Sequence, residues 1–321
     1  MHETKPLRIL LAGNYSFPCY EKACADALDK IGCDVIRFSW SRYFIPLRGR
    51  IENYFAWSGP ATRAANRELI DSVRQCEADA VIVWRGTHVD REALRHIRRQ
   101  NPHCILVSNN NDDPFSMAYT TRRAPVNQRR LWKRFRQAIP EYDLNFVYRP
   151  VNVAEYIEQG GRDVRILMPY FVPELTRPYE LTREELDRYG CDVVFIGHYE
   201  ADGRERYLRA LAKAGLKVRL FGHDWPDDIT RKIPGLPKIY PVYGDEYAKA
   251  LCGAKMCLCF LSRLNRDVYT RRSFEIPACG CLMLSERTQE MTNLFREDRD
   301  AVYFSDEKEL VAAFVVLEQG A

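Results

Sequence analysis

The sequence predicts an α/β protein built from two doubly wound domains in series. Short apolar runs rich in β-branched residues alternate with segments of helical periodicity through most of the 321 residues. Strands separated by helices in this way are typical of βαβ units and of parallel sheets that are covered on both faces. A proline-rich break near residue 170 interrupts the alternation, which then begins again. The length is sufficient for two domains of ordinary size.

The first half contains the longer of the two alternating patterns. The predicted strands cover residues 8–12, 34–39, 80–84, 104–108, 145–148 and 164–167. The predicted helices lie between them, near residues 20–31, 62–76, 90–99, 127–139 and 152–159. Because the strands are nearly continuous apolar runs, we expect helices on both faces of one parallel sheet.

The break covers residues 169–191 and contains three prolines within ten residues, which is typical of an interdomain linker. We therefore predict domains at 1–170 and 171–321. In the second, the strands are expected at 192–196, 217–221, 257–261 and 281–285, and the helices at 204–214, 246–251 and 272–279. Ligands of such sheets bind beyond the carboxyl ends of the strands, so residues in those loops are the site candidates.

Composition excludes several classes of protein. With 48 basic and 44 acidic residues the net charge is +4, which does not indicate a specific nucleic-acid partner. No stretch approaches the roughly 20 apolar residues of a membrane span, and the first residues lack a secretory signal, so we expect a cytoplasmic protein. The eleven cysteines include no C-x-x-C pair, which favours reduced thiols over disulfides or a zinc site.

Polar residues follow the first and fourth predicted strands. Gly13 and Asn14 do not form a G-x-G-x-x-G fingerprint, so NAD binding is unsupported, but their position makes them substrate-binding candidates. Residues 109–113 read Asn-Asn-Asn-Asp-Asp. Asp112 or Asp113 could bind acceptor hydroxyls or act as a general base, and a structural turn is the alternative. Since the two aspartates are adjacent, we expect at most one to point into a site.

Residues 122–136 hold seven basic residues and no acid, and their apolar side chains share one helical face. A basic amphipathic helix can lie on an anionic membrane surface or receive an anionic acceptor. The alternative is an ordinary helix with a solvated face.

The second half offers a more specific group of residues. Arg204 begins a helix after the loop 197–203, where backbone N–H groups and a guanidinium suit a diphosphate. His223 and Tyr243 border the next strand and helix and could flank a nucleobase. Asp267 and Glu275 lie eight positions apart. A carboxylate at a helix start can accept both ribose hydroxyls, although helix capping is the alternative for Glu275.

Two arginines, Arg271 and Arg272, lie between these acids. Arginines in such a place can neutralise a diphosphate leaving group, because negative charge grows on the departing phosphate during glycosyl transfer. The segment 267–281 therefore combines a carboxylate for the sugar of the nucleotide with cations for its phosphates.

Three segments carry a family resemblance. Residues 272–286, which begin Arg-Ser-Phe-Glu, resemble the C-terminal signature of GT-B glycosyltransferases of the CgeB-like (spore-maturation-protein-like) group. Residues 301–310 resemble the v-x-F-x-d-x-x-E-L segment of that family, and 111–114 its D-D-P turn. The resemblance implies the GT-B fold, in which two Rossmann-like domains face a central cleft. It also implies a nucleotide-sugar co-substrate and no required metal or cofactor.

The resemblance further implies site residues. Glu275 matches the second acid of the E-x7-E motif of related families, which binds the ribose, and Asp267 takes the place of the first, where the motif has Glu. The expected catalytic residues are Asp112, Asp113 and Asp267. The expected substrate-binding residues are Gly13, Asn14, Arg204, His223, Tyr243, Arg271, Arg272 and Glu275.

We therefore predict a metal-independent, hexosyltransferase-like glycosyltransferase that uses a UDP- or dTDP-sugar. The acceptor is expected to be lipid-linked or a protein glycan, with peripheral contact to the inner membrane face through 122–136. Two alternatives remain open: a nucleotide-sugar binding module without turnover, and a sugar-nucleotide epimerase on the same fold.

Overall fold

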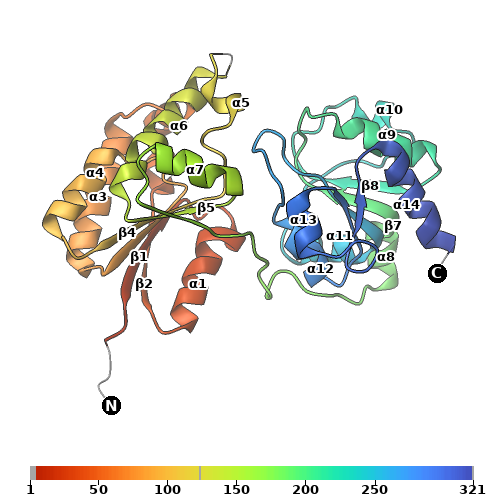
Figure 1. Ribbon diagram of the computed structural model, residues 1–321, viewed down its shortest axis with the longest axis horizontal. Coiled ribbons are helices and arrows are strands. Elements are labelled where there is room, and N and C mark those ends of the chain that lie inside the picture. The colour runs from red at the N-terminus through yellow and green to blue at the C-terminus, as the bar shows by residue number, and fades with distance from the viewer. Residues whose placement is uncertain (1–4, 123, 320–321) are drawn as a thin grey trace. The chain divides into compact units, whose positions relative to one another are not determined.

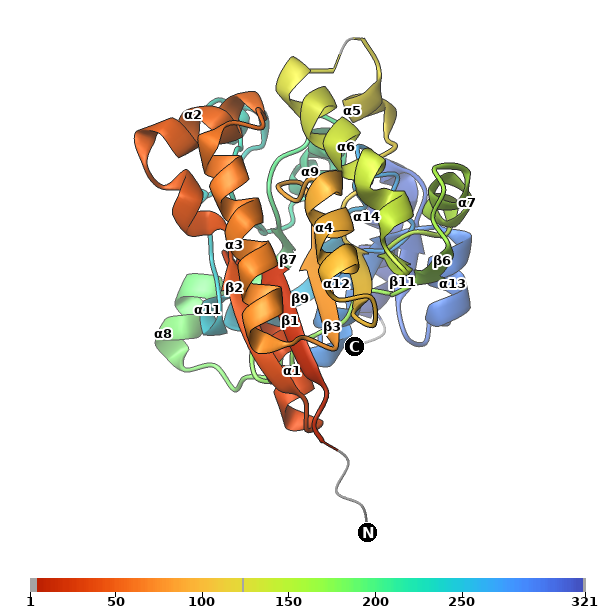
Figure 2. The same cartoon turned by 90° about the vertical axis from the view of Figure 1, so that its left-hand side faces the viewer.

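The structure, a computed structural model, describes residues 5–122 and 124–319 and divides into two compact units, Met1–Met168 and Pro169–Ala321. Each unit holds one parallel β-sheet with helices on both of its faces (Figures 1 and 2). The predicted α/β class with two doubly wound sheets is confirmed. The units separate at the start of the proline-rich break, between Met168 and Pro169.

The sheet of the first unit has the strand order β2-β1-β3-β4-β5-β6, and every neighbouring pair is parallel. The strands are β1 (Arg8–Gly13), β2 (Asp34–Ser39), β3 (Ala80–Trp84), β4 (Ile105–Asn110), β5 (Leu144–Val147) and β6 (Asp163–Ile166). The order reverses at β1, which pairs with β2 on one side and β3 on the other. Connections leave in opposite directions there, and such a switch point is where doubly wound sheets bind ligands.

The helices of this unit include two elements that the sequence did not indicate, the 3-10 helix η2 (Ser41–Phe44) and α2 (Leu47–Phe55). The large apolar side chains of α2 are exposed, so this helix lacks the periodicity of a core-facing helix, and η2 is too short to show a period, although its Tyr43 and Phe44 pack against the core. The other elements are the π-helix η1 (Pro18–Lys22), α1 (Ala23–Lys30), α3 (Pro60–Cys76), α4 (Arg91–Gln100), α5 (Met117–Thr120), α6 (Val126–Ala138), the 3-10 helix η3 (Ile139–Glu141) and α7 (Pro150–Glu158).

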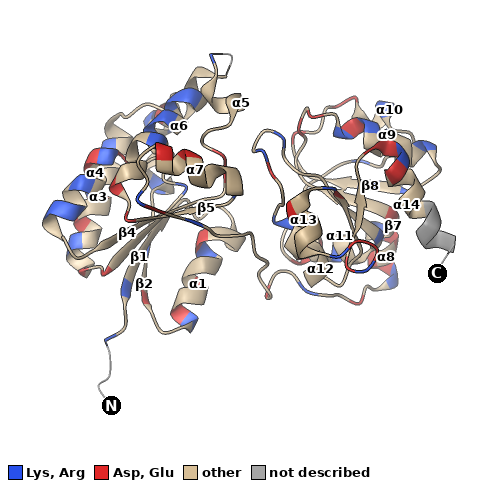
Figure 3. Cartoon of the chain, in the orientation of Figure 1, with Lys and Arg blue, Asp and Glu red and all other residues tan. Residues whose placement is uncertain are grey.

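The amphipathic helix α6 packs its apolar face into the core. Trp132, Phe135 and Ile139 are buried together with Val147 and Tyr156. The face on which the predicted membrane contact of 122–136 depended is therefore not available to a bilayer. α6 is an ordinary helix that is rich in Lys and Arg (Figure 3), of which Arg130 and Lys133 are exposed. Arg123, also in that stretch, lies outside the described residues.

The sheet of the second unit has the order β11-β10-β9-β7-β8 and is also parallel throughout. Its strands are β7 (Cys191–Ile196), β8 (Val218–Phe221), β9 (Ala254–Cys259), β10 (Met283–Glu286) and β11 (Val302–Phe304). The helices are α8 (Arg183–Tyr189), α9 (Arg204–Lys213), α10 (Ile229–Lys232), α11 (Asp245–Cys252), α12 (Arg272–Ala278), α13 (Gln289–Leu294) and α14 (Glu307–Gln319). The order reverses at β7, so the loops after β7 and β9 border the second switch point.

All eleven cysteines are free thiols. Within the described part of the chain, no helix has both the length and the apolar character to cross a bilayer. The same residues contain no group of three or more histidine, cysteine or acidic side chains arranged to hold a metal ion.

Candidate functional site

A polar pocket of ≈ 320 Å³ opens beyond the carboxyl ends of β1 and β3, at the switch point of the first unit. Its walls come from the loops after β1, β2 and β3 and from η2, α2 and α6. The lining residues are Asn14, Trp40, Ser41, Phe44, Asn53, Ala56, Arg85, Thr87, His88, Asn127, Gln128 and Leu131. Aromatic surfaces beside amide, hydroxyl and imidazole groups are a lining that suits a small polar ligand.

His88 occupies one wall of this pocket. Its Nε2 lies 2.9 Å from Asn53 Oδ1, and its ring packs 4.4 Å from the ring of Phe44, measured between centroids. Burial, together with the positive charges of Arg134 and Arg85, lowers the pKa of His88 to about 3. The imidazole is therefore neutral near pH 7, and its second ring nitrogen, Nδ1, lies 3.3 Å from Thr87 Oγ1, so the ring holds two other residues of the pocket wall in place.

Gly13 and Asn14 have different positions. Asn14 is exposed and lines the pocket, whereas Gly13 is buried beneath it. A Cβ on Gly13 would lie 2.4 Å from the side chain of the buried Glu21, whose carboxylate accepts a hydrogen bond from the Asn14 N–H at 2.8 Å. Because Gly13 has no side chain, there is room for Glu21, whose carboxylate orients the loop that contains Asn14.

The adjacent aspartates after β4 also differ. Asp113 is fully buried, and its Oδ1 accepts hydrogen bonds from Asn152 Nδ2 at 2.9 Å and from the Phe115 N–H at 3.0 Å. Asp112 is partly exposed, and its Oδ2 lies 2.6 Å from Nε of Arg85, which lines the pocket. Of the two, only Asp112 reaches the pocket wall, and it does so through Arg85.

Unusual backbone conformations accompany the carboxyl ends of both sheets. Tyr15 (φ 59°) and Arg85 (φ 49°) follow β1 and β3, and Asp224 (φ 63°) and Arg266 (φ 52°) lie in the loops after β8 and β9. Positive φ is costly for residues other than glycine, and such conformations concentrate at binding and catalytic sites. Both edges therefore have the backbone geometry of functional loops.

In the second unit, Arg204 is buried at the start of α9. Its Nη2 lies 2.7 Å from Asp202 Oδ2 and 3.4 Å from Glu200 Oε2. Ser262, after β9, donates a hydrogen bond of 2.9 Å to the same Glu200 oxygen, which ties the two loops of the switch point together. The structure thus places Arg204 beneath the loop, with its guanidinium committed to two carboxylates.

Burial raises the pKa of both carboxyls, but their hydrogen bonds and ion pairs outweigh it. The pKa of Glu200 is held below its usual value by His198, Arg204 and Ser262. The pKa of Asp202 is likewise held below its usual value, mainly by Arg204. Both groups are therefore ionised at neutral pH, and the ion pairs stay intact there.

Glu275 lies in the first turn of α12 with 3% of its surface exposed. Tyr247, on α11, donates a hydrogen bond of 2.7 Å to Oε2, and Arg271 donates to Oε1. The side chain of Arg271 is partly exposed. The structure therefore brings the predicted ribose ligand and one predicted phosphate ligand into direct contact.

Arg272 and Asp267 lie in the same loop region. Arg272 Nη2 donates to the Phe260 carbonyl at 3.0 Å, and its Cζ lies 5.2 Å from the ring centre of Phe195. The backbone N–H of Asp267 donates to the Ser262 carbonyl at 2.8 Å, and its charge acts on Arg272. Arg272 is thus anchored to the sheet edge, and Arg271 is the more accessible cation.

His223 and Tyr243 come together beyond β8. His223 Nε2 and the Tyr243 hydroxyl are hydrogen-bonded, and Tyr243 is 55% exposed. The chain reaches this position through Gly222 (φ 144°), where a Cβ would lie 2.0 Å from the Gly197 carbonyl oxygen. Only glycine permits this close approach of the loops after β7 and β8.

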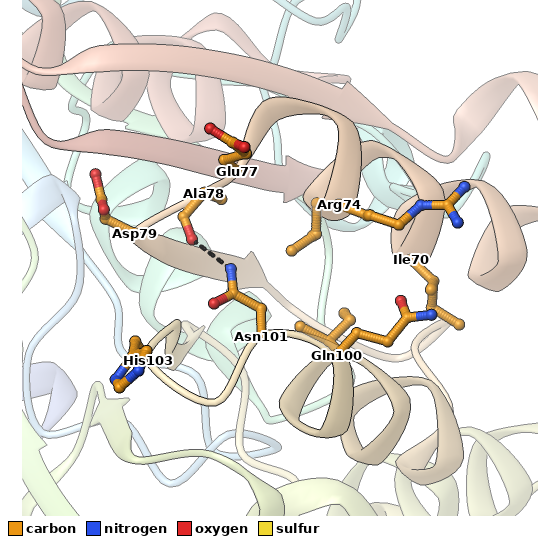
Figure 4. A pocket seen from close by; sticks show the side chains of 10 residues that line it. Ile70, Arg74, Glu77, Ala78, Asp79, Gln100, Asn101 and His103 are labelled. Carbon is orange, nitrogen blue, oxygen red and sulfur yellow. Dashed lines mark hydrogen bonds between the residues drawn. The ribbon is translucent and has the colours of Figure 1, made fainter.

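A second pocket of ≈ 330 Å³ lies in the first unit, at the opposite edge of the sheet (Figure 4). Its lining includes Arg74, Glu77, Asp79 and Asn101, and Asn101 Nδ2 donates to the Ala78 carbonyl at 3.0 Å. This pocket adjoins the amino end of β3, away from the strand ends at which doubly wound sheets hold their ligands. It contains none of the predicted site residues.

Several pocket residues were not predicted from the sequence, among them Ser41, Asn53, Arg85 and His88. Ser41 and Asn53 belong to η2 and α2, which had no periodic signal. A signal existed for the other two, since the polar run at 85–88 directly follows a predicted strand.

Comparisons with known proteins agree with this fold. Residues 204–319 match a family model described as glycosyl transferase-like. A comparison with curated proteins gave no match. Among solved structures, sucrose-phosphate synthase of Thermosynechococcus elongatus is similar with a TM-score of 0.66 and 11% identity, over 98% of this chain and 90% of that one.

Two further structures have the same architecture. HepE of Anabaena, in complex with UDP and glucose, is similar with a TM-score of 0.62 and 11% identity, over 98% of this chain and 90% of that one. MnaA of S. aureus, in a structure with UDP, has a TM-score of 0.55 and 12% identity, over 97% and 88%. The chain thus has the GT-B architecture of these structures, and residues 204–319, in its second unit, match the glycosyl transferase-like family model.

Proposed function

We propose that the chain transfers a hexose from a UDP- or dTDP-sugar to a hydroxyl-bearing acceptor, as a member of the CgeB-like group. The observation that carries this proposal is the cluster of Glu275, Tyr247 and Arg271 at the carboxyl edge of the second sheet, inside the segment that matches the glycosyl transferase-like family. The complex of HepE with UDP and glucose supports the choice of donor class.

The cluster suits a nucleoside diphosphate. Tyr247 fixes the orientation of the Glu275 carboxylate, which can then accept hydrogen bonds from the ribose hydroxyls. Arg271 can turn from that carboxylate to the diphosphate and stabilise the charge that develops on the leaving group. The exposed pair of His223 and Tyr243 offers ring faces for the base. Asp267 stays our candidate for a contact with the donor sugar.

The acceptor is proposed to bind in the pocket of Asn14 and His88. Uncharged groups line most of it, and Arg85 adds one exposed cation. Asp112, held by Arg85, is the candidate base if the enzyme inverts the anomeric centre. We assign Asp113 to the turn after β4, because its carboxylate serves Asn152 and the Phe115 N–H.

His88→Phe tests the pocket. The substitution keeps an aromatic ring but removes the ring nitrogens that hold Asn53 and Thr87 in the pocket wall. We therefore expect the KM for the acceptor to rise about tenfold, the value of one or two neutral hydrogen bonds. Nucleotide binding should not change, since His88 belongs to the other unit. The KM for the acceptor is measured from initial rates at saturating donor, and His103→Phe is the matched control. Equal acceptor KM values in wild type and His88→Phe would exclude His88 from the acceptor site.

A thermal-shift screen tests the proposed function itself. The chain is heated with UDP, dTDP, GDP and CMP and with their sugar conjugates, and positive donors are then incubated with a panel of saccharide acceptors. A ligand at 100 times its Kd stabilises the folded state by about 2.7 kcal/mol, which gives a clear shift in Tm. Binding followed by nucleotide release that requires an acceptor supports transfer. Binding without turnover indicates a binding module, and conversion without an acceptor indicates an epimerase.

A further inference from the structure

The segment from Ile45 to Trp57 presents an unusual apolar surface. Six large apolar side chains within these thirteen residues are between 41% and 71% exposed: Ile45, Leu47, Ile51, Tyr54, Phe55 and Trp57. Single exposed apolar residues are common on soluble proteins, but a contiguous group of this size marks an interaction surface. We name these six residues the α2 face.

The three aromatic members of the α2 face touch one another. Phe55 and Trp57 are stacked with ring centres 5.0 Å apart and an interplanar angle of 18°, and Tyr54 meets Phe55 edge-on at 5.0 Å. Leu47, Ile51 and Tyr54 follow at helical spacing along α2, so they share one side of the helix. The result is one continuous surface with aromatic rings at one end and aliphatic side chains at the other.

The exposed charges within this segment have one sign. Arg48 and Arg50 are exposed on α2. The one acid between residues 45 and 57 is Glu52, which is buried and accepts hydrogen bonds from the N–H groups of Ala61 and Thr62 at 2.9 and 3.0 Å. Its negative charge is thus directed into the first turn of α3, and the exposed part of the segment carries cations alone.

The neighbouring helix α6 extends the cationic border. Asn127, on α6, donates a hydrogen bond of 3.0 Å to the Tyr54 carbonyl, and Arg130 Nη1 lies 3.5 Å from the Phe55 carbonyl. Arg130 is exposed, as is Lys133 three residues further along α6. A short amphipathic helix with aromatic and aliphatic side chains on one side and arginines around them matches the chemistry of an anionic bilayer surface, with apolar acyl chains below anionic headgroups.

We propose that the α2 face is a peripheral membrane-docking surface for bilayers that contain anionic lipids. The apolar side chains enter the headgroup boundary, Trp57 and Tyr54 lie at the level where such rings are favoured, and Arg48 and Arg50 contact lipid phosphates.

Docking there has a consequence for the acceptor. The same helix that bears the α2 face supplies Asn53 and Ala56 to the wall of the His88 pocket. A lipid-linked acceptor could therefore place its saccharide in the pocket while its lipid stays in the bilayer. This consequence rests on the proposed function, whereas the membrane contact itself does not.

Co-sedimentation of the full-length chain with vesicles tests the proposal. Vesicles of phosphatidylcholine alone are compared with vesicles that also contain phosphatidylglycerol. We expect binding to the anionic vesicles, weaker binding as salt is added, and at least tenfold weaker binding by the double variant Leu47→Glu/Ile51→Glu and by Arg48→Glu/Arg50→Glu. Ile31→Glu and Ile105→Glu, which change exposed isoleucines elsewhere in the same unit, are the matched controls and should bind like wild type.

Folding is checked separately by the Tm of each variant, and Trp57→Phe gives a second readout. The emission of wild type should shift to shorter wavelength on anionic vesicles, and this shift should be largely lost in Trp57→Phe. The proposal is overturned if wild type does not bind, if the charge variants bind as well as the controls, or if the α2 face instead mediates a dimer that these variants dissolve. Vesicle binding by a chain that responds to no nucleotide would support the docking surface and reject the proposed function.

Discussion

Replacing Arg204 by methionine is expected to lower the free energy of unfolding of the second unit by about 3–5 kcal/mol, which is typical when one partner of a buried ion pair is removed. The variant leaves the carboxylates of Glu200 and Asp202 buried without their cation, and both side chains are less than 10% exposed. Because methionine fills a similar space, the decrease in the free energy of unfolding reflects the lost charge more than the lost volume. Urea unfolding at pH 7 measures the effect.

Arg206→Met is the matched control on the same helix. Arg206 is 53% exposed and pairs with Glu307 at 3.2 Å, so its loss should cost less than about 1 kcal/mol. Similar costs for both variants would show that the buried network does not stabilise the loop after β7.

The effect of Arg204→Met should depend on pH. In the wild type the pKa values of Glu200 and Asp202 lie below their usual values, although burial alone would raise them. The two carboxylates therefore stabilise the folded state above about pH 4, near the pKa values of the unfolded chain. This stabilisation is lost as the pH falls through their lower pKa values in the folded protein. Without Arg204 the same carboxyls can protonate under milder acid, which relieves the penalty. The difference between variant and wild type should therefore shrink below about pH 5, and a difference that stays constant from pH 7 to pH 4 would contradict this explanation.

Replacing Glu275 by glutamine is expected to weaken nucleotide binding and to lower kcat/KM for transfer by about 10- to 100-fold, because hydrogen bonds to a charged group contribute about 1.5–3 kcal/mol. The amide is nearly isosteric and can still accept the hydrogen bond from Tyr247, so the fold of α12 should persist. Titration calorimetry with UDP measures the affinity for the nucleotide, and initial rates measure kcat/KM. Glu184→Gln, at an exposed glutamate on α8, is the control and should behave like wild type.

The strands were predictable because their apolar runs are nearly continuous. β1 and β3 are buried on both faces, so few polar residues interrupt them. The helix α2 was not predictable in the same way, since its large apolar residues point outward and produce no core-facing period. For α6 the amphipathic pattern was correct, but burial in a core and burial in a bilayer require the same pattern. Only the packing of Trp132 and Phe135 distinguishes the two.

The candidate site likewise contains some contacts that the sequence could predict and others that it could not. Glu275 and Arg271 could be proposed from one short segment, because the pair is four positions apart on the same turn. The contact of His88 with Asn53 joins residues 35 positions apart, and Asn53 lies on α2, which has no sequence signal, so the contact arises only from the folded chain. The ion pairs of Arg204 could have been predicted from the sequence, because two acids, Glu200 and Asp202, precede it by four and two positions.

A double-mutant cycle between Glu275 and the ribose tests the account most directly. Calorimetry compares UDP with 2′,3′-dideoxy-UDP on wild type and on Glu275→Gln. If Glu275 holds the ribose, removal of the hydroxyls weakens binding to wild type by about 10- to 100-fold and has little further effect on the variant. Equal losses in both proteins would show that the hydroxyls and Glu275 act independently, and the assignment of the donor site to this edge of the second sheet would be wrong.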